Sequence, residues 1–413
     1  MDNNLPRNLA SQIRELLAQF PAVVILGARQ VGKTEIARHI APDFVYVDLE
    51  NPADRDRIEF DPGFFFEQHP SAVILDEAQE FPLLFNYLRG VIDNSREAVG
   101  RFIITGSSSP ELLSYVSETL AGRVAIIELG TLKANEFYKK PLNNFYDIFN
   151  TTLDKNKLVF NTPEITLENM QMAWLKGGYP EPCLKALKDE TFYERWMVNY
   201  QSTYLNRDLA KLFPKLDKIN YRRFLTMLGK LSGTIINRSD LARALSISAP
   251  TVAHYLDIAE GTYLWRQLPS FERQISKNLV KMPKGHVRDS GLLHSLLGIY
   301  DLEQLLSDPV AGRSFEGFVI EEIIKGIQGA GIYGTEFSYY RTRSGAEIDL
   351  IIKGRFGMLP IEIKLGSAAS RKQLTALSNF IEQNNLDFGL LINQSTKVEW
   401  LTKNILQLPV YYL

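Results

Sequence analysis

The sequence is poor in cysteine, in long apolar runs and in net charge. Cys183 is its only cysteine, which excludes an intrachain disulfide framework and is typical of a reducing compartment. No apolar run approaches the roughly 20 residues that span a bilayer, and no apolar core follows the N-terminal MDNNLPRN, so neither a membrane span nor a signal peptide is expected. The formal net charge of −2 gives no overall basic field, so nucleic-acid binding would need local patches. We expect a soluble, cytoplasmic protein with no membrane partner.

The 413 residues have an ordinary globular composition, and this length is typical of about two to four domains. Within residues 1–140, short apolar runs alternate with helical stretches. The runs cover residues 22–26, 44–49, 72–76, 102–105 and 124–129. Nearly continuous apolar runs indicate strands that are buried on both faces, which predicts an α/β domain with a mainly parallel sheet.

Three further regions are expected after residue 140. Residues 141–232 begin as a polar, Asn- and Thr-rich connection and continue as helices. Residues 233–300 contain a helix, a short turn, a second helix and a strand, which is typical of a winged helix-turn-helix. Residues 301–413 combine a helix, short apolar strands, a polar helix and a last strand, which predicts a second α/β domain.

The stretch GARQVGKT (27–34) matches the pattern G-x-x-x-x-G-K-[ST] and lies between an apolar strand and a helical pattern. Gly27 and Gly32 let backbone N–H groups approach phosphate oxygens without a Cβ in the way. Lys33 supplies a charge for the β- and γ-phosphates, and Thr34 supplies a hydroxyl ligand for Mg²⁺. The rest of the phosphate cradle is formed by Ala28, Arg29, Gln30 and Val31. The sequence therefore predicts a site for ATP and Mg²⁺.

The stretch VILDEAQ (73–79) places Asp76 and Glu77 at the carboxyl end of a buried strand. Beside a phosphate-binding loop, Asp76 would hold Mg²⁺, mostly through water, and Glu77 would orient and polarise the attacking water. The alternative is a plain strand end with two solvated carboxylates.

Two more positions are candidates for contact with the γ-phosphate. FIITGSSS (102–109) ends a strand in hydroxyl groups, and Ser107 is the candidate sensor, with Thr105 and Ser108 as equal alternatives. Arg123, in LAGRV, could stabilise transition-state charge, also across a subunit boundary. The alternative for Arg123 is a solvated surface arginine.

Several motifs together resemble one known superfamily. They are GARQVGKT, VDLEN, ILDEAQ, ITGSSS, LAGRV with the later ELGTLKANEF, and YLNRDLAKL with its Arg207–Asp208 pair. In these motifs the chain resembles the AAA+ superfamily, specifically the prokaryotic predicted ATPases that carry a C-terminal domain of unknown function 4143. The resemblance covers nearly the whole chain and implies an AAA+ fold, ATP binding and hydrolysis, and a capacity to form homo-oligomers through AAA+ domains. It leaves the substrate open.

The stretch NRSDLARALSISAPTVAHYLDIAE (237–260) carries the helix-turn-helix. Ser239 is expected to cap the first helix, and the second helix would present Thr251, His254 and Tyr255 to a DNA groove. Three arginines are available for phosphate contacts: Arg238, Arg243 and Arg266. Because nearby carboxylates dilute this charge and winged helices also serve as protein contacts, DNA contact and a structural role both stay open.

The stretch EIDLIIKGRFGMLPIEIK (347–364) predicts two apolar strands joined by a tight turn. Its Asp349, Glu362 and Lys364 form a pattern that resembles the PD-(D/E)XK nuclease fold. This resemblance implies that Asp349 and Glu362 hold Mg²⁺, that Lys364 lies beside the nucleophilic water, and that Glu316 on the preceding helix completes the cluster. The alternative is a structural ion pair between Lys364 and one of the acids. Of two further acids, Glu347 is expected to be exposed and Asp289 is expected to cap a helix.

These motifs favour an ATP-dependent protein that associates with nucleic acid, DNA more readily than RNA. In this interpretation an AAA+ module drives or gates a winged-helix and nuclease-like C-terminal half. Two alternatives stay open. One is an ATP-regulated switch or scaffold whose C-terminal domain binds a protein, and the other is an ATP-dependent DNA binder with an inactive nuclease fold.

Overall fold

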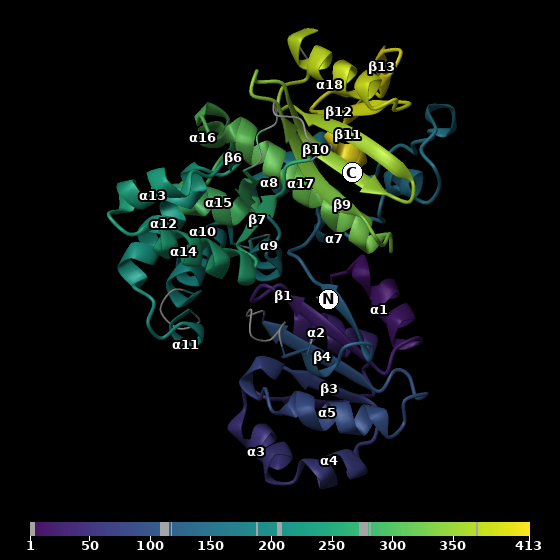
Figure 1. The fold of residues 1–413 in the computed structure, drawn as a ribbon, viewed down its shortest axis with the longest axis vertical. Coiled ribbons are helices and arrows are strands. Elements are labelled where there is room, and N and C mark those ends of the chain that lie inside the picture. Colours follow the sequence, from purple (N-terminus) through teal and green to yellow (C-terminus); the bar gives the residue numbers. More distant parts are fainter. Residues whose placement is uncertain are drawn as a thin grey trace. The chain divides into compact units, whose positions relative to one another are not determined.

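The computed structural model describes residues 5–107, 115–116, 118–186, 189–204, 209–271, 280, 282–368 and 371–413 (Figure 1). Internal contacts divide the chain into two compact units. Unit 1 comprises Met1–Leu132 with Gly261–Tyr263, and unit 2 comprises Lys133–Glu260 with Leu264–Leu413. Among the described residues, no helix is both long and apolar enough to cross a membrane. Of the positions named above, Ser108 and the Arg207–Asp208 pair lie outside the described residues.

Unit 1 is built on a five-stranded parallel sheet with the order β2-β3-β4-β1-β5. Its strands are β1 (Ala22–Gly27), β2 (Val45–Asp48), β3 (Val73–Asp76), β4 (Phe102–Ser107) and β5 (Val124–Glu128). Its described helices include α1 (Leu9–Leu17), α2 (Lys33–Ile40), α3 (Pro52–Phe60), α4 (Pro62–Gln68), η1 (Ala78–Glu80) and α5 (Leu84–Asp93). The five apolar runs of the sequence form these five strands, which confirms the predicted parallel α/β fold.

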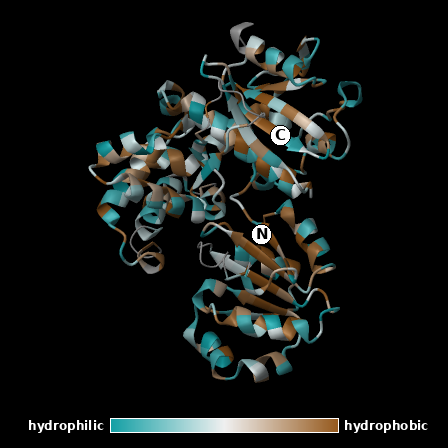
Figure 2. Ribbon diagram, in the orientation of Figure 1, coloured by the Kyte–Doolittle hydropathy of each residue, from teal (hydrophilic) through white to brown (hydrophobic). Residues whose placement is uncertain are grey.

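The three central strands, β3, β4 and β1, are buried on both faces and form the core of unit 1. Every residue of β1 is buried, and the strands are among the most apolar parts of the unit (Figure 2). Val24 of β1 packs in one cluster with Phe85 of α5, while α1 and α2 also contact β1. Because parallel strands end at the same edge of a sheet, the carboxyl ends of β1, β4 and β3 lie side by side. That edge carries Gly27, Ser107 and Asp76.

Unit 2 contains a six-stranded mixed sheet and a three-stranded antiparallel sheet (Figure 1). The large sheet has the order β13-β14-β12-β11-β10-β9. Its strands are β9 (Glu336–Arg341), β10 (Glu347–Gly354), β11 (Gly357–Ile363), β12 (Gly389–Asn393), β13 (Glu399–Thr402) and β14 (Ile405–Pro409). The small sheet has the order β6-β8-β7 and comprises β6 (Thr234–Ile235), β7 (Trp265–Leu268) and β8 (Lys284–Val287).

The helices of unit 2 lie before, between and after these strands in the sequence. Those before β8 are α7 (Ala134–Phe137), η2 (Asn144–Phe149), η3 (Lys155–Lys157), α8 (Leu167–Lys176), α9 (Pro180–Lys185), α10 (Glu190–Thr203), α11 (Leu209–Leu212), α12 (Lys218–Lys230), α13 (Arg238–Leu245) and α14 (Ala249–Gly261). Those after β8 are α15 (Ser290–Leu297), α16 (Leu302–Ser307), α17 (Ala311–Gly329), α18 (Arg371–Gln383) and η5 (Val410–Tyr412).

The strands β10 and β11 form the predicted hairpin. They pair antiparallel from Leu350 opposite Ile361 to Gly354 opposite Gly357. Gly357 has a φ of 110°, a conformation that side chains other than glycine's rarely adopt. On its other side β11 pairs with β12, so the second strand of the hairpin lies inside the sheet.

The two helices predicted for the helix-turn-helix are α13 and α14. Of the small sheet, β6 precedes them in the sequence, and β7 and β8 follow them. The expectation that Ser239 caps the first helix is wrong, because Asn237 takes that role. The Asn237 side chain accepts hydrogen bonds from the backbone N–H groups of Ser239 and Asp240. The cap predicted for Asp289 is confirmed, because its carboxylate accepts from the N–H of Leu292 at the start of α15.

One apolar cluster joins the polar connection to the C-terminal half of unit 2. Phe145, Tyr146 and Phe149 of the connection belong to the same buried cluster as residues of α17 and the large sheet. The rings of Phe149 and Phe356 lie edge to face with their centroids 4.9 Å apart. The Asn- and Thr-rich stretch is therefore docked through its few aromatic residues.

Candidate functional site

The loop at residues 27–34 has the backbone that the motif requires. β1 ends at Gly27 and α2 begins at Lys33, so the loop joins a buried strand to a helix N-terminus. A Cβ at Gly27 would lie 2.2 Å from the carbonyl oxygen of Leu129, so only glycine fits there. Gly32 has a φ of 91°, which glycine adopts without strain. N–H groups at the start of a helix favour anions, so this loop is built to receive phosphate oxygens.

Lys33 is buried and folds back along the loop. Its ammonium lies 3.3 Å from the carbonyl oxygen of Gly27, 3.0 Å from that of Ala28 and 3.3 Å from the hydroxyl of Ser107. Burial lowers the pKa of Lys33, against the opposing influence of the Glu77 carboxylate. The ammonium is therefore held by neutral oxygens at the point where the motif predicts phosphate.

Asp76 lies at the end of β3 and gathers three hydroxyl donors. Thr34 donates to Asp76 Oδ2 over 2.8 Å, Tyr46 donates to the same oxygen over 2.7 Å, and Thr105 donates to Oδ1. Burial and the hydrogen bond to Asp76 raise the pKa of Tyr46, which keeps its proton available for donation. The predicted pair Thr34 and Asp76 is thus brought together. Tyr46 was missed, because a tyrosine on a strand carries no signal of its own.

Glu77 follows Asp76 and turns toward β4. Its carboxylate accepts from Gln79 Nε2 over 2.6 Å and from the Ser107 hydroxyl over 3.0 Å. Burial raises the pKa of Glu77, but the charge of Lys33 and these hydrogen bonds outweigh burial and leave the pKa below its usual value. Glu77 is therefore ionised at neutral pH, and Ser107 lies between it and Lys33. Gln79 belongs to the same group and was missed by the sequence reasoning.

Arg7 braces the phosphate loop from the N-terminal segment. Its guanidinium donates to the carbonyl oxygen of Val31 and to that of Gly130, over 2.7 Å in each case. The loop is thereby tied to the chain that leaves β5. No motif in the sequence points to Arg7, because its partners are backbone atoms far along the chain.

Arg123 is engaged with another residue of unit 1. Its Nε and Nη2 atoms each lie 2.8 Å from a carboxylate oxygen of Asp93, in a bidentate pair at the end of α5. Among the described residues, the side-chain partner of Arg123 is therefore Asp93, and not Lys33, Glu77 or Ser107. Its action across a subunit boundary stays a prediction.

The predicted acids of the C-terminal hairpin converge on a lysine. Lys364 Nζ lies 2.7 Å from Glu362 Oε1 and 3.3 Å from Asp349 Oδ2. Asp349 Oδ2 also accepts from the N–H of Ile363 over 2.9 Å. Both acids lie on apolar strands and are about 5% exposed or less. The other oxygen of Glu362, Oε2, is buried and has no hydrogen-bond partner.

A second lysine, from outside the hairpin, completes this cluster. Lys284 Nζ lies 2.6 Å from Glu316 Oε1, 2.7 Å from Glu347 Oε1 and 3.5 Å from Asp349 Oδ1. The expectation that Glu347 is exposed is therefore wrong, since it is half-buried and ion-paired. We call these residues the acid–lysine cluster: Lys284, Glu316, Glu347, Asp349, Glu362 and Lys364. Lys284 was missed because its distance along the chain hides the contact.

Burial and the crowding of carboxylates raise the pKa values of two acids in the cluster. Burial raises the pKa of Glu316 to about 8, and the Asp349 charge adds to this effect. Burial and the Asp349 charge likewise raise the pKa of Glu362 to about 8. Across the described parts of the chain, no three or more His, Cys, Asp or Glu side chains are arranged to hold a metal ion. The cations that face these acids are the ammonium groups of Lys284 and Lys364 and, at Glu347, the guanidinium of Arg341.

The helix-turn-helix presents a different surface from the one predicted. The expectation for Tyr255 is wrong: its ring is buried, 5.1 Å from that of Tyr221. His254 is exposed, as predicted. Arg266 is bound to Glu321 of α17 through Nε and Nη2, so its guanidinium is committed to the protein interior. Arg238 and Arg243 are exposed on α13.

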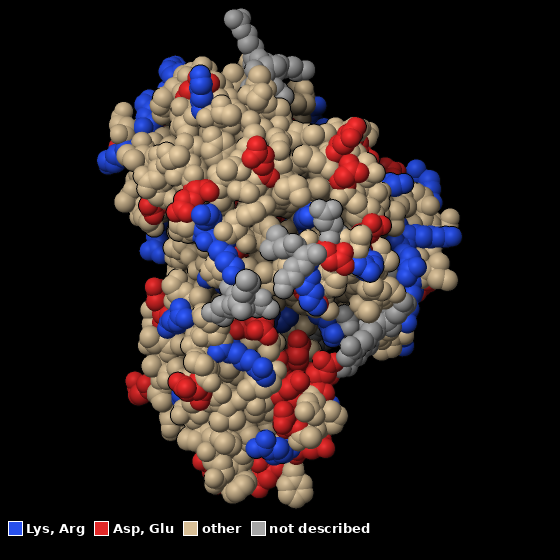
Figure 3. All heavy atoms as spheres, turned by 180° about the vertical axis from the view of Figure 1, so that it is seen from behind, with Lys and Arg blue, Asp and Glu red and all other residues tan. Residues whose placement is uncertain are grey.

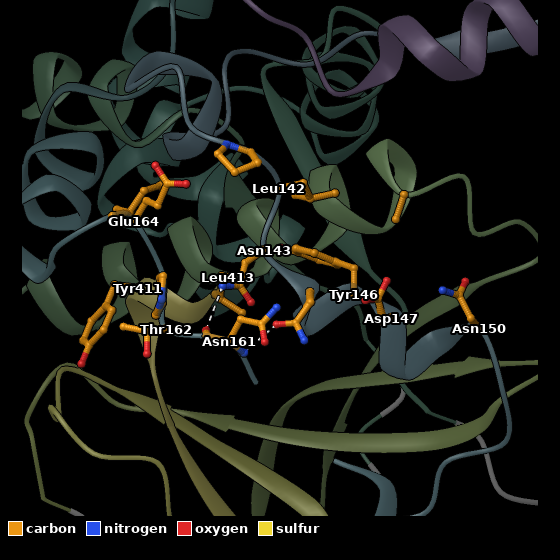
Figure 4. A pocket seen from close by; sticks show the side chains of 15 residues that line it. Leu142, Asn143, Tyr146, Asp147, Asn150, Asn161, Thr162, Glu164, Tyr411 and Leu413 are labelled. Atoms are coloured by element: carbon orange, nitrogen blue, oxygen red, sulfur yellow. Dashed lines mark hydrogen bonds between the residues drawn. The ribbon is translucent and has the colours of Figure 1, made fainter. Parts of the chain in front are cut away.

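A cavity of about 430 Å³ lies in the polar connection (Figure 4). Its lining is rich in asparagine, but these amides already hold the chain. Asn144 accepts from the N–H of Asn161 and donates to the carbonyl oxygen of Val159, and Asn143 donates to the carbonyl oxygen of Asn161. The lining contains none of the residues predicted to be catalytic.

The strand order of unit 1, the glycine-shaped loop and the Thr34–Asp76 pair define this unit as an AAA-type P-loop domain. Comparison with known proteins agrees. Residues 19–138 match the family model described as an AAA domain, and residues 167–303 and 311–413 match two domains of unknown function, DUF8612 and DUF4143.

Two curated relatives extend this similarity over most of the chain. The uncharacterized protein Rv2008c of Mycobacterium tuberculosis is 34% identical over 367 residues, which cover 88% of this chain and 75% of that protein. The uncharacterized protein MJ1544 of Methanocaldococcus jannaschii is 23% identical over 381 residues, which cover 88% of this chain and 79% of that protein. The chain belongs to the family of AAA-domain proteins that includes Rv2008c.

Solved structures show a more distant likeness. The Walker-type ATPase paby2304 of Pyrococcus abyssi has a TM-score of 0.40 and 14% identity, over 70% of this chain and 94% of that one. AMPPCP-bound DnaA from Aquifex aeolicus has a TM-score of 0.27 and 16% identity, over 60% of this chain and 86% of that one.

Proposed function

We propose that the protein binds ATP with Mg²⁺ at the loop of residues 27–34 and hydrolyses the ATP. The observation that carries this proposal is the continuous group in which Ser107 links Lys33 to Glu77, beside the Thr34–Asp76 pair. A hydroxyl and a carboxylate 2.8 Å apart are the hard oxygen donors that Mg²⁺ prefers, so the residues fit this ion.

Each residue of the group has a task that follows from its surroundings. Mg²⁺ that arrives with ATP would neutralise charge on the β- and γ-phosphates. Lys33 is bonded to neutral oxygens, and an ammonium bonds anionic phosphate oxygens more strongly. Glu77 is ionised and can accept a hydrogen bond from water and orient it for attack. Ser107 contacts both side chains, so it can link the phosphate to the water.

The test is to measure nucleotide binding and phosphate release by the full chain. A fluorescent ATP analogue should bind wild-type protein and fail to bind Lys33→Ala at the same concentration, because the variant loses the charge in the loop. Arg57→Ala, at an exposed site on α3, is the matched control and should bind as wild type does. Equal binding and turnover by Lys33→Ala would contradict the proposal.

A second candidate function is metal-dependent cleavage of a phosphodiester in unit 2. It is supported by the convergence of Asp349 and Glu362 on one cation and by Glu316 nearby on α17. In the observed geometry the acids are paired with lysines, so they would supply hard oxygen ligands to a cation only after these ion pairs open, and Lys364 would then stabilise the charge of an attacking water. DNA is the proposed substrate, because the same unit carries a helix-turn-helix and exposed arginines on α13.

Cleavage assays separate this function from its alternatives. Single- and double-stranded DNA and RNA should be incubated with the protein, Mg²⁺ or Mn²⁺, and with or without ATP. Cleavage that Asp349→Asn abolishes and Glu336→Gln leaves intact supports the nuclease, since Glu336 is an exposed acid on β9. Binding without cleavage favours an inactive nuclease fold. If the protein shows no nucleic-acid binding and no cleavage, the result favours an ATP-regulated switch that contacts a protein.

A further inference from the structure

The position of Lys284 is fixed by a strand that packs on α17. Lys284 pairs with Ile235 of β6 and with Leu268 of β7, so it is part of the small sheet next to the helix-turn-helix. Residues two apart on a strand point to the same face. Accordingly, Lys284 meets Glu316 of α17 and His286 meets Glu321 of the same helix.

A glycine allows this close approach. A Cβ on Gly317 of α17 would come within 3.3 Å of the His286 side chain. The hydrogen bond between His286 Nε2 and Glu321 Oε1, 2.9 Å long, holds the strand against the helix two residues away from Lys284. The ammonium of Lys284 is therefore delivered into the cluster by the packing of β8.

The Lys284 ammonium occupies the position among the acids where a divalent cation would bind. It contacts three carboxylates from two elements, Glu316 of α17 and Glu347 and Asp349 of β10, and its side chain is 6% exposed. An ammonium is a compact cation with three donors, so it can satisfy the oxygens that a divalent cation would ligate.

One atom of the cluster is left over. Glu362 Oε2 is buried without a hydrogen-bond partner, although burying an unpartnered carboxylate oxygen is costly. Asp349 is shared, with one oxygen toward Lys284 and the other toward Lys364. The carboxylates therefore surround two ammonium groups and still leave one acceptor unused.

We propose that Lys284 is a built-in counter-cation that closes the acid–lysine cluster, and that a divalent cation enters only when β8 withdraws this ammonium. The inference rests on the proposed cleavage function of unit 2. Because Lys284 belongs to the small sheet of the helix-turn-helix, cation entry is coupled to the position of that sheet. Coupling of this kind is reciprocal, so a cation bound among the carboxylates must loosen the packing of β8 on α17.

The experiment titrates Mn²⁺ alone, without nucleotide, into the full chain. Lys284→Met keeps most of the side-chain length and removes the charge, and Lys353→Met is the matched control at an exposed site on the same hairpin. Lys284→Met should bind Mn²⁺ about tenfold more tightly than wild type or the control. Adding Asp349→Asn to Lys284→Met should abolish the gain.

Two results would overturn the inference, and only one of them also contradicts the cleavage proposal. If wild type already binds Mn²⁺ at Asp349 as tightly as Lys284→Met does, Lys284 does not close the cluster, and the cleavage proposal stands. If neither protein binds Mn²⁺ at Asp349, the closure and the metal-dependent cleavage proposal both fail.

A second measurement follows amide exchange in wild-type protein, so its readout does not depend on the folding of a Lys284 variant. Saturating Mn²⁺ should speed backbone amide exchange in β8, at residues 285–287, and leave exchange in β12 unchanged. Mn²⁺ binding that is sensitive to Asp349→Asn and leaves β8 exchange unaltered would overturn the closure.

Discussion

Lys133 and Glu322 form an ion pair in the core of unit 2, with 3.3 Å between Nζ and Oε2 and each side chain about 1% exposed. Lys133 is the first residue of unit 2, and Glu322 lies on α17. Glu322 also accepts from the N–H of Ala134 and pairs with Lys325. This carboxylate therefore anchors the start of unit 2 on the helix that also supplies Glu316 to the acid–lysine cluster.

The two halves of this pair should differ in their effect on stability. Glu322→Gln leaves the buried Lys133 without its ion-pair partner, so it should lower the free energy of unfolding by about 3–5 kcal/mol. Lys133→Met should cost less, because Glu322 keeps Lys325 and the Ala134 N–H. Urea unfolding of unit 2 measures both, with the exposed Glu303→Gln on α16 as control. A larger loss in Lys133→Met than in Glu322→Gln would contradict the anchoring role.

Glu77→Gln should separate nucleotide binding from hydrolysis. The amide keeps the size of the side chain but cannot accept a proton from water, so turnover should fall about 10²- to 10⁴-fold while ATP binding persists. Phosphate release and binding of a fluorescent ATP analogue measure the two properties. Glu59→Gln on α3 is the control, since this acid is exposed and remote from the loop in sequence. Unchanged turnover in Glu77→Gln would remove it from the hydrolytic group.

The sequence predicted the AAA-type part of the fold well because its signals are local. Apolar runs define the strands, and both Gly27 and Gly32 belong to a motif that is contiguous in sequence, although the clash that requires glycine at position 27 comes from the distant Leu129. The hairpin of β10 and β11 was predictable for the same reason, since its turn glycine and its alternating charges lie within one stretch.

The missed residues act through contacts that join distant parts of the chain. Lys284 lies 65 residues before Asp349, and Arg7 bonds to backbone oxygens at Val31 and Gly130. No periodicity or motif encodes such partners. The errors at Tyr255 and Arg266 have the opposite cause. Both residue types suit a DNA-binding surface. In the structure, however, Tyr255 packs on Tyr221 and Arg266 pairs with Glu321, so neither side chain faces outward to contact DNA.

His294 should make stability depend on acid pH. It is fully buried, with Nδ1 2.8 Å from the carbonyl oxygen of Leu175 and Nε2 2.6 Å from the Ser314 hydroxyl. Burial lowers its pKa from 6.5 to about 4. The unfolded chain protonates His294 more readily than the folded chain does. The stabilisation that results from keeping His294 neutral is therefore complete above pH 6.5. It is lost as the pH falls from about 6.5 to about 4, by up to about 3 kcal/mol.

The measurement is the free energy of unfolding of unit 2 between pH 4 and pH 7. His294→Gln should lower stability at pH 7 and flatten the slope between pH 6.5 and pH 4. His254→Gln, at an exposed histidine of α14, should leave the slope as it is. An unaltered slope in His294→Gln would show that this buried imidazole is not the group that titrates.

DNA contact should depend on α12 as well as on the helix-turn-helix. α12 buries Tyr221, Phe224 and Leu228 on one face, and this leaves Arg223 and Lys230 exposed. These two residues are seven positions apart, so they project from the same side of the helix. Blue side chains gather at the right edge of Figure 3, which views the molecule from behind Figure 1. A basic strip of this kind contacts phosphates without reading the base sequence.

Replacing Arg223 and Lys230 with alanine should weaken DNA binding similarly for different sequences. The slope of log affinity against log salt should fall by about one for each phosphate contact removed, so by about two in the double variant. Arg55→Ala with Arg57→Ala on α3 is the matched control, because it removes two cations from the surface of unit 1. Fluorescence anisotropy with a labelled duplex at several salt concentrations gives both slopes. If the α12 variant keeps the wild-type slope while the control variant loses it, the DNA lies on unit 1 and not on α12.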